Sequence, residues 1–372
     1  MKQIVTSVLM LIVAACSDGT KDNDSTVVSL HGELGGDANG FARACAPRDF
    51  VFPQDHLAHP DFRNEWWYVT GNVATPDSLK LGFHATFFRV AALAPQQAAS
   101  ESAWETSQFY MAHFAVTREG DTRVSAHERF ARSAAGLAGT RLENAMASVW
   151  LEDWTLTQTK AGDAPVWQLR LADENSAAID VQLSANKPRV LQGNQGYSQK
   201  SADPCNASYY YAYTRLHTEG QITVDGIAYP VEGSSWLDRE WSSSALADNQ
   251  VGWDWFALQL NDARDIMFYQ LRESNGQPGS FSSAVEIDAD GVKRTIAVPV
   301  VEVDRWWQSD SGARYPVAGR LIRKDSAEVI HFTPLIDNQE LNLTVRYWEG
   351  AIQLFDELGN HIGQGYLELT GY

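Results

Sequence analysis

The chain has 372 residues, 13 of them tryptophan, and carries a formal net charge of −18 at pH 7. This charge excludes the basic surface by which proteins bind nucleic acid. It also disfavours contact with anionic lipid surfaces, so attachment to a membrane needs a dedicated anchor. The length is sufficient for two medium-sized domains.

The N-terminus predicts a targeting segment over residues 1–15. The apolar run from Ile4 to Ala15 fits the core of a signal peptide and is too short for a membrane span. Small residues precede Cys16, and this pattern resembles the lipobox of bacterial lipoproteins. The resemblance implies cleavage before Cys16 and lipidation of this cysteine. The residue after this cysteine is Ser17, whereas Asp at this position would favour retention in the inner membrane. We therefore expect an outer-membrane lipoprotein that faces the periplasm. The alternative is an ordinary secretory signal in which Cys16 has no role.

Residues 16–45 predict a flexible tether, because they are rich in small and polar residues and show no periodicity. Apart from Cys16, the cysteines of the chain are Cys45 and Cys205. An oxidising periplasm would allow them to form a disulfide. The alternative is two free thiols.

Strand signals dominate the rest of the chain. Residues 81–88 and 253–260 alternate with a period of two, and turn sequences such as Val224-Asp-Gly226 separate such runs. Residues 125–142 have a pattern that predicts a short helix. Many short strands joined by tight turns predict an all-β fold made of antiparallel barrels or sandwiches.

An internal repeat predicts two related domains. Residues 67–89 consist of an aromatic strand, an aspartate turn and a second aromatic strand that ends in arginine, and residues 255–272 repeat this order. Self-similarity over this length favours duplication over chance. We therefore predict an N-terminal domain over residues 46–235 and a C-terminal domain over residues 236–372.

Tryptophan recurs beside charged residues, at 66–67, 236–241, 253–256 and 306–307. Tryptophan combines a large apolar surface with one N–H donor, which suits the wall of a deep ligand pocket. The alternative, for each tryptophan taken singly, is simple packing in a β-core.

Long stretches of the chain resemble the AttH-type lipocalin-like family, which includes carotenoid 1,2-hydratases and proteins labelled predicted secreted hydrolases. The resemblance implies two lipocalin-like antiparallel β-domains packed together, with an apolar-lined cavity. Members are linked to water addition to polyene double bonds and to pericyclic cyclisations. The matching stretches are 64–72, 86–89, 207–216, 233–241, 252–260, 269–272, 347–350 and 365–372.

The run from Trp236 to Trp241 holds the candidate catalytic residues Asp238, Arg239 and Glu240. Strand alternation places Trp236, Asp238 and Glu240 on one face, and Arg239 and Trp241 on the other. A carboxyl group deprived of water has a raised pKa and can protonate an alkene, while aromatic rings stabilise the resulting carbocation. The alternative is a buried structural network in which these carboxylates pair with arginines.

One position departs from the family. The carotenoid hydratases carry histidine where this chain has Arg239, and a further acid of that group has no counterpart near Tyr269. Arginine is essentially never neutral, so it cannot replace histidine as a proton shuttle. This departure argues against the carotenoid reaction itself and leaves the predicted pocket intact.

The expected pocket combines aromatic walls with a few polar groups. His84 and His113 lie in otherwise apolar strands and are expected to face the pocket. The alternative is that each is a core residue whose ring nitrogens have hydrogen-bond partners. The histidines and acids at 55–61 have loose spacing, so neither a metal nor a cofactor is expected. The expected substrate-binding residues are Trp66, Tyr68, His84, His113, Tyr213, Arg215, Trp236, Trp241, Trp253 and Tyr269.

Two functions follow. The first is a hydratase- or isomerase-like enzyme acting on an apolar, unsaturated substrate. The second is a non-catalytic carrier or chaperone of lipid-like ligands that serves exporter components. Hydrolase chemistry has no support, because the chain lacks a nucleophile elbow. The expected partners are a hydrophobic small molecule or lipid and, through the anchor, the membrane.

Overall fold

The computed structural model describes residues 28–29, 38–97, 106–173, 176–243, 246–247 and 249–372. Within these residues the fold is nearly all β, as predicted, and its helical segments are two 3₁₀ turns, η1 (Gln54–His56) and η2 (Pro95–Gln97). None of the helices described is long and apolar enough to cross a membrane. The predicted signal peptide and lipidation site at Cys16 lie outside the described residues.

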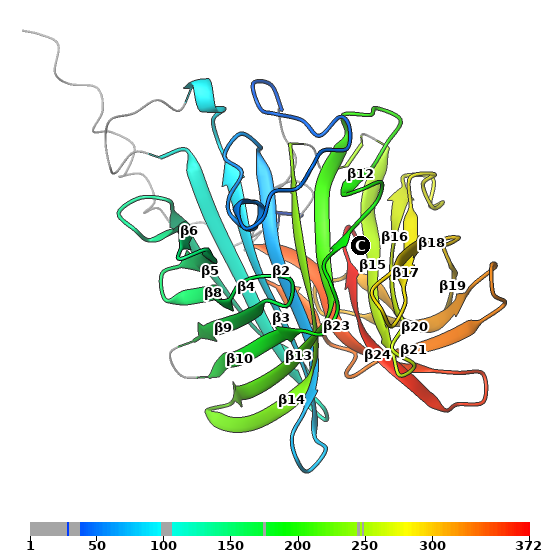
Figure 1. Cartoon of the computed structure of the whole chain (residues 1–372). Coiled ribbons are helices and arrows are strands. Elements are labelled where there is room, and N and C mark those ends of the chain that lie inside the picture. The colour runs from blue at the N-terminus through cyan, green and yellow to red at the C-terminus, as the bar shows by residue number, and fades with distance from the viewer. Residues whose placement is uncertain (1–27, 30–37, 98–105, 174–175, 244–245, 248) are drawn as a thin grey trace, which may run out of the picture.

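Two sheets make up the fold (Figure 1). The first has 13 strands: β2 (Asn64–Ala74), β3 (Lys80–Ala91), β4 (Gln108–Arg118), β5 (Ser125–Arg132), β6 (Ala138–Glu143), β7 (Met146–Leu151), β8 (Trp154–Lys160), β9 (Val166–Ala172), β10 (Ala177–Ala185), β11 (Val190–Leu191), β12 (Tyr197–Gln199), β13 (Ala207–Val224) and β14 (Ile227–Ser242). Their order is β5-β4-β3-β2-β14-β13-β10-β9-β8-β7-β6, with β11 and β12 also paired to β13.

The second sheet has 11 strands: β1 (Val28–Ser29), β15 (Gln250–Leu260), β16 (Asp265–Glu273), β17 (Ser283–Ile287), β18 (Lys293–Thr295), β19 (Val300–Gln308), β20 (Arg314–Ile322), β21 (Val329–Pro334), β22 (Glu340–Asn342), β23 (Val345–Phe355) and β24 (His361–Leu369). Their order is β18-β17-β16-β15-β24-β23-β21-β20-β19, and β1 and β22 also pair with β23.

Both sheets follow one plan. Apart from the short β1, each begins with a long hairpin, β2–β3 or β15–β16, whose first strand pairs with the last strand of the same sheet, β14 or β24. These hairpins contain the two segments of the internal repeat. The chain passes from one sheet to the other between Ser242 and Gln250. The predicted boundary at 235/236 therefore falls inside β14, which pairs with β2 without interruption as far as Ser242.

The helix predicted within residues 125–142 is wrong. That segment forms β5 and β6, and β5 extends the sheet by pairing with β4 from Ser125 to Arg132. The partner strand satisfies the backbone groups of β5, and this tertiary pairing outweighs a weak local helical pattern.

Each sheet encloses a core of its own, and a third and a fourth apolar cluster lie between the sheets. Trp67 belongs to the core of the first sheet and Phe256 to that of the second. Tyr68 and Trp255 belong to the third cluster, together with residues of both sheets. Because successive side chains on a strand point to opposite faces, Trp67 and its neighbour Tyr68 serve different clusters.

Close packing and a buried charge cluster fix the two sheets relative to each other. Asp265 of β16 accepts hydrogen bonds from Arg215 of β13 at 2.6 Å and from Lys187 at 2.8 Å. A Cβ on Gly82 of β3 would lie 2.5 Å from the Cβ of Ala351 on β23, so this approach of the sheets requires glycine.

Cys45 and Cys205 form a disulfide with an S–S distance of 2.00 Å. It joins the end of the predicted tether to the loop that precedes β13.

We expect the double variant Cys45→Ala/Cys205→Ala to lower the free energy of unfolding by about 2–5 kcal/mol, because the crosslink restricts the unfolded chain. Urea denaturation measures this loss. A reducing agent should bring the unmodified protein to the stability of the variant and leave the variant unchanged. An equal response of both proteins would contradict the expectation.

Candidate functional site

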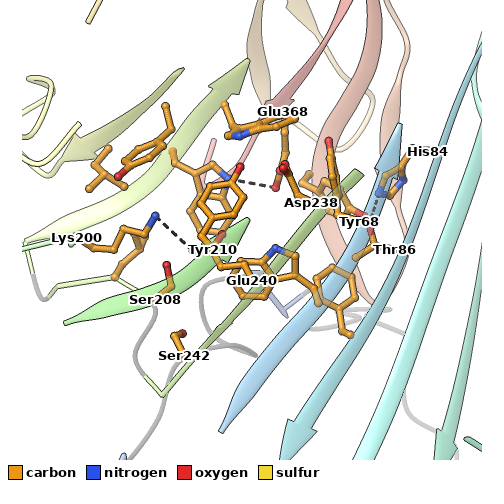
Figure 2. Close-up of a pocket in the computed structure, with 18 residues that line it drawn as sticks. Tyr68, His84, Thr86, Lys200, Ser208, Tyr210, Asp238, Glu240, Ser242 and Glu368 are labelled. Atoms are coloured by element: carbon orange, nitrogen blue, oxygen red, sulfur yellow. Dashed lines mark hydrogen bonds and ion pairs between the residues drawn. The ribbon is translucent and has the colours of Figure 1, made fainter. Parts of the chain in front are cut away.

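A pocket lies between the two sheets, rather than inside either one (Figure 2). It holds about 890 Å³ of empty space, a figure that includes the part open to solvent. Both sheets contribute, mainly with aromatic side chains. The lining residues are Trp66, Tyr68, His84, Thr86, Phe88, Lys200, Ser208, Tyr210, Asp238, Glu240, Ser242, Leu246, Trp253, Trp255, Tyr269, Leu271, Tyr347 and Glu368.

Strand alternation builds the wall on the side of the first sheet. Asp238 and Glu240 of β14 face the pocket, and Trp66 and Tyr68 of β2 lie directly beside them, since Asp238 pairs with Tyr68 and Glu240 with Trp66. The intervening Arg239 lies on the opposite face. The predicted division of this strand into two faces is thus the observed one.

Asp238 is almost completely enclosed, with 3% of its surface exposed. The indole N–H of Trp236 donates to its Oδ1 at 2.8 Å, and the hydroxyl of Tyr210 also bonds to the carboxyl group. Burial raises the pKa of Asp238 well above its ordinary value; these two hydrogen bonds oppose the rise, and the charges of Glu240 and Glu368 add to it. The folded protein therefore favours the protonated acid.

Glu368 of β24 brings a second raised acid to the pocket. The indole N–H of Trp253 donates to its Oε1 at 3.2 Å. Burial raises the pKa of Glu368 to about 8, and the nearby charge of Glu240 contributes to the rise. The two sheets thus each supply a carboxyl group that holds its proton more tightly than an exposed one.

Lys200 is the cation of the pocket lining. Its Nζ lies 3.4 Å from Oε1 of Glu240 and 4.2 Å from the centroid of the Tyr269 ring. Figure 2 shows Lys200 and His84 on opposite sides of the pocket. The carboxylate of Glu240 is therefore paired, whereas Asp238 and Glu368 are held by neutral donors.

The two histidines occupy different places. His84 lines the pocket, fully buried, with Nε2 2.6 Å from Oγ1 of Thr86 and with no hydrogen-bond partner for Nδ1 among the described residues. Burial lowers its pKa well below the ordinary value, so the ring is neutral. His113 lies behind the lining, with Nδ1 2.9 Å from the hydroxyl of Tyr347, and burial lowers its pKa to about 3.

Arg239 and Trp241 were expected at the pocket and lie inside the first sheet instead. Arg239 pairs with the buried Glu65, and its guanidinium stands 3.8 Å from the ring of Trp67. Trp241 stacks on His59 with ring centroids 3.9 Å apart. Both belong to the inward face of β14, opposite to the face on which Asp238 borders the pocket.

Tyr213 and Arg215 also lie outside the pocket. The hydroxyl of Tyr213 accepts a hydrogen bond from Arg189 at 3.0 Å, and its ring is part of the first core. Arg215 is held by Asp265 at the contact between the sheets. Trp236, also expected in the lining, stands behind it as the hydrogen-bond donor to Asp238.

The remaining expected residues, Trp66, Tyr68, His84, Trp253 and Tyr269, line the pocket. The sequence did not single out Lys200 or Glu368, and from the tyrosine run at 209–213 it singled out Tyr213, whereas Tyr210 lines the pocket. Glu368 carries the signal that identified Asp238, an acid two positions from an aromatic residue in an apolar strand. Lys200 lies in a loop after β12 and carries no such signal.

The comparisons with known proteins agree with this architecture. The profile of the AttH-like family matches residues 43–372. A structure described as an AttH protein from Nitrosomonas europaea is 34% identical, with a TM-score of 0.77, and the match covers 89% of this chain and 100% of that one. Among curated proteins, none matches the chain.

Two more distant structures show the fold alone. Kievitone hydratase from Nectria haematococca is 14% identical with a TM-score of 0.62, over 89% of this chain and 98% of that one. CghA, solved with Sch210972, is 10% identical with a TM-score of 0.52, over 91% of this chain and 97% of that one.

The raised pKa of Glu368 predicts a pH-dependent stability. Above pH 4.5 the unfolded chain loses this proton while the folded protein keeps it up to about pH 8, so the residue destabilises the fold progressively across that window. We expect Glu368→Gln to gain stability over the unmodified protein between these limits, as measured by urea denaturation at a series of pH values. The exposed Glu232→Gln is the control, and a gain that is the same at every pH would refute the assignment.

Proposed function

Because the chain belongs to the AttH-like family, we propose that it is a hydratase-like enzyme that adds water to an unsaturated, apolar substrate in the pocket between the sheets. The single observation that carries the proposal is Asp238, a buried acid that favours its protonated form and faces a cavity walled by aromatic rings. The likeness of the fold to kievitone hydratase supports the same class of reaction.

The first step is proton transfer. The O–H bond of Asp238 breaks as a C–H bond forms at one carbon of the alkene, and the other carbon becomes a cation. The rings of Trp66 and Trp253 offer π-faces to this cation, and the new carboxylate of Asp238 lies beside it. The neutral donors Trp236 and Tyr210 then hydrogen-bond the carboxylate, which lowers the cost of its charge.

The second step restores the acid. A water molecule attacks the cation, a C–O bond forms, and the proton that the water releases returns to the carboxylate of Asp238. The net change is addition of one hydrogen and one hydroxyl group across the double bond. Glu240, held by Lys200, orients the attacking water.

We expect Asp238→Asn to lower the rate of hydration at least about 100-fold, the contribution of a positioned general acid. The probes are lycopene and squalene in detergent micelles, and the readout is a product heavier by one water. The rate of hydration by the unmodified enzyme should be highest at low pH. It should fall as pH rises through the raised pKa of Asp238, because only the protonated acid reacts.

The matched control is Glu349→Gln, which changes a buried acid that accepts a hydrogen bond from Tyr68 at 2.6 Å and stands outside the pocket lining. It should retain activity. Equal rates for Asp238→Asn and the unmodified protein would refute the assignment of the acid.

A non-catalytic carrier of lipid-like ligands is the second candidate, and Lys200 favours it. This cation, stacked on Tyr269 beside the apolar wall, suits a polar head group and requires no acid. A carrier would return the probes bound and unchanged, and Asp238→Asn would leave their affinity intact. Exporter components would be the partners of such a carrier.

We also propose that the protein is a periplasmic lipoprotein, anchored to the outer membrane through Cys16. The support is the apolar run of residues 4–15 followed by small residues and cysteine.

We expect Cys16→Ser to abolish labelling by radioactive palmitate and to release the protein from the membrane fraction, because no acyl chain can then be attached. The control is Cys45→Ser, which should be labelled as strongly as the unmodified protein. Labelling of Cys16→Ser would refute the anchor.

A further inference from the structure

A row of cross-strand neighbours runs from the pocket to the edge of the first sheet. Glu240 of β14 lies opposite Trp66 of β2, which in turn lies opposite Phe88 of β3. Phe88 lies opposite Met111 of β4, and Met111 opposite Phe130 of β5. Residues directly opposite on antiparallel strands share a face and touch, so these side chains form one continuous line.

The row becomes more exposed with distance from the pocket. Phe88 is 5% exposed, Met111 is half-buried, and Phe130 on the edge strand is 52% exposed. The next row adds Val90 and the exposed Phe109, which lie opposite each other. An apolar surface of this kind, which joins a pocket to solvent, is characteristic of a binding site.

The second sheet forms a flank of this surface. Leu343 and Val345, at the start of β23, belong to one apolar cluster with Phe88, Val90 and Met111. The surface is therefore bordered along its inner half by the other sheet, and it is continuous with the pocket because Phe88 also lines the pocket.

We propose that this surface is a track for the tail of the ligand, and that the substrate is a long, neutral, apolar chain whose reactive end lies at Asp238. Phe88 of β3 is the last member of the row that lines the pocket. From β3 to β5 the row crosses two strand spacings of ~4.8 Å, so the track adds roughly 10 Å to the pocket. The placement of the reactive end at Asp238 rests on the proposed function. The binding of the tail along the track does not depend on it.

The charges of the pocket fit a neutral chain. Asp238, Glu240 and Glu368 face the cavity, and Lys200, the cation of the described lining, is already paired with Glu240. An anionic head group would meet this acidic cluster, whereas an uncharged chain meets aromatic and aliphatic side chains along the row from Trp66 to Phe130.

The test compares a short and a long neutral chain, octanol and hexadecanol, by displacement of a fluorescent naphthylamine dye from the full-length protein. We expect Met111→Ser/Phe130→Ser to weaken hexadecanol binding about tenfold, the loss for roughly two methylene groups left in water. Octanol has half as many carbons as hexadecanol and is expected not to reach along the row, so it should bind as before.

The control is Val292→Ser, an exposed apolar residue outside the row, at 64% exposure. It should leave both affinities unchanged. Equal weakening of octanol and hexadecanol by the double variant, or no weakening of either, would overturn the track. So would a change from dimer to monomer in size-exclusion chromatography without a change in hexadecanol affinity, which would identify the patch as a contact between copies.

The two proposals fail separately. Asp238→Asn should retain the preference for the long chain while it loses hydration. Loss of the chain-length preference in Met111→Ser/Phe130→Ser, with the KM for lycopene raised and its kcat unchanged, supports the track. An unchanged preference overturns the track without touching the acid.

Discussion

The contact between the outer faces of the two sheets is the constraint on which the pocket depends. Each sheet already has an internal core, so its outer face would carry aromatic and acidic residues into water if the sheets were apart. The cluster of Asp265, Arg215 and Lys187 fixes the contact at one place, and the approach of Gly82 to Ala351 fixes it at another. A buried pair of this kind stabilises weakly but penalises other arrangements strongly, because separation of the partners leaves a charge uncompensated.

Two buried acids of the first sheet show how their surroundings set their charge. Glu65 points inward, and although burial alone would raise its pKa, the guanidinium groups of Arg89 and Arg239 bring it below its ordinary value. Asp238 points outward to neutral donors, and burial raises its pKa. The first is a structural carboxylate, and the second is an acid that can give up a proton. The arginine network foreseen as the alternative for Asp238 therefore exists, but around Glu65.

The acidic cluster of the pocket has a cost that function explains. Raised acids such as Asp238 and Glu368 make the fold less stable as pH rises, because the unfolded chain releases protons that the folded protein keeps. Groups of this kind concentrate at functional sites, where the shifted pKa serves the reaction. The aromatic walls that exclude water from these carboxyl groups are also the walls that would hold an apolar chain and a developing cation.

The sequence by itself determined the all-β class, the repeated hairpin plan and the division of β14 into two faces, because each depends on local alternation of side chains along a strand. It determined the family through long stretches that resemble other members. It did not determine which face borders the pocket. Arg239 and Trp241 were expected there and lie in the first core, and Arg215 serves the contact between the sheets. Glu368 and Asp238 stand 130 positions apart in the chain and meet only through the packing of one sheet on the other. Periodicity reports that a strand has two environments, but only tertiary packing decides which of them is a core and which is a cavity.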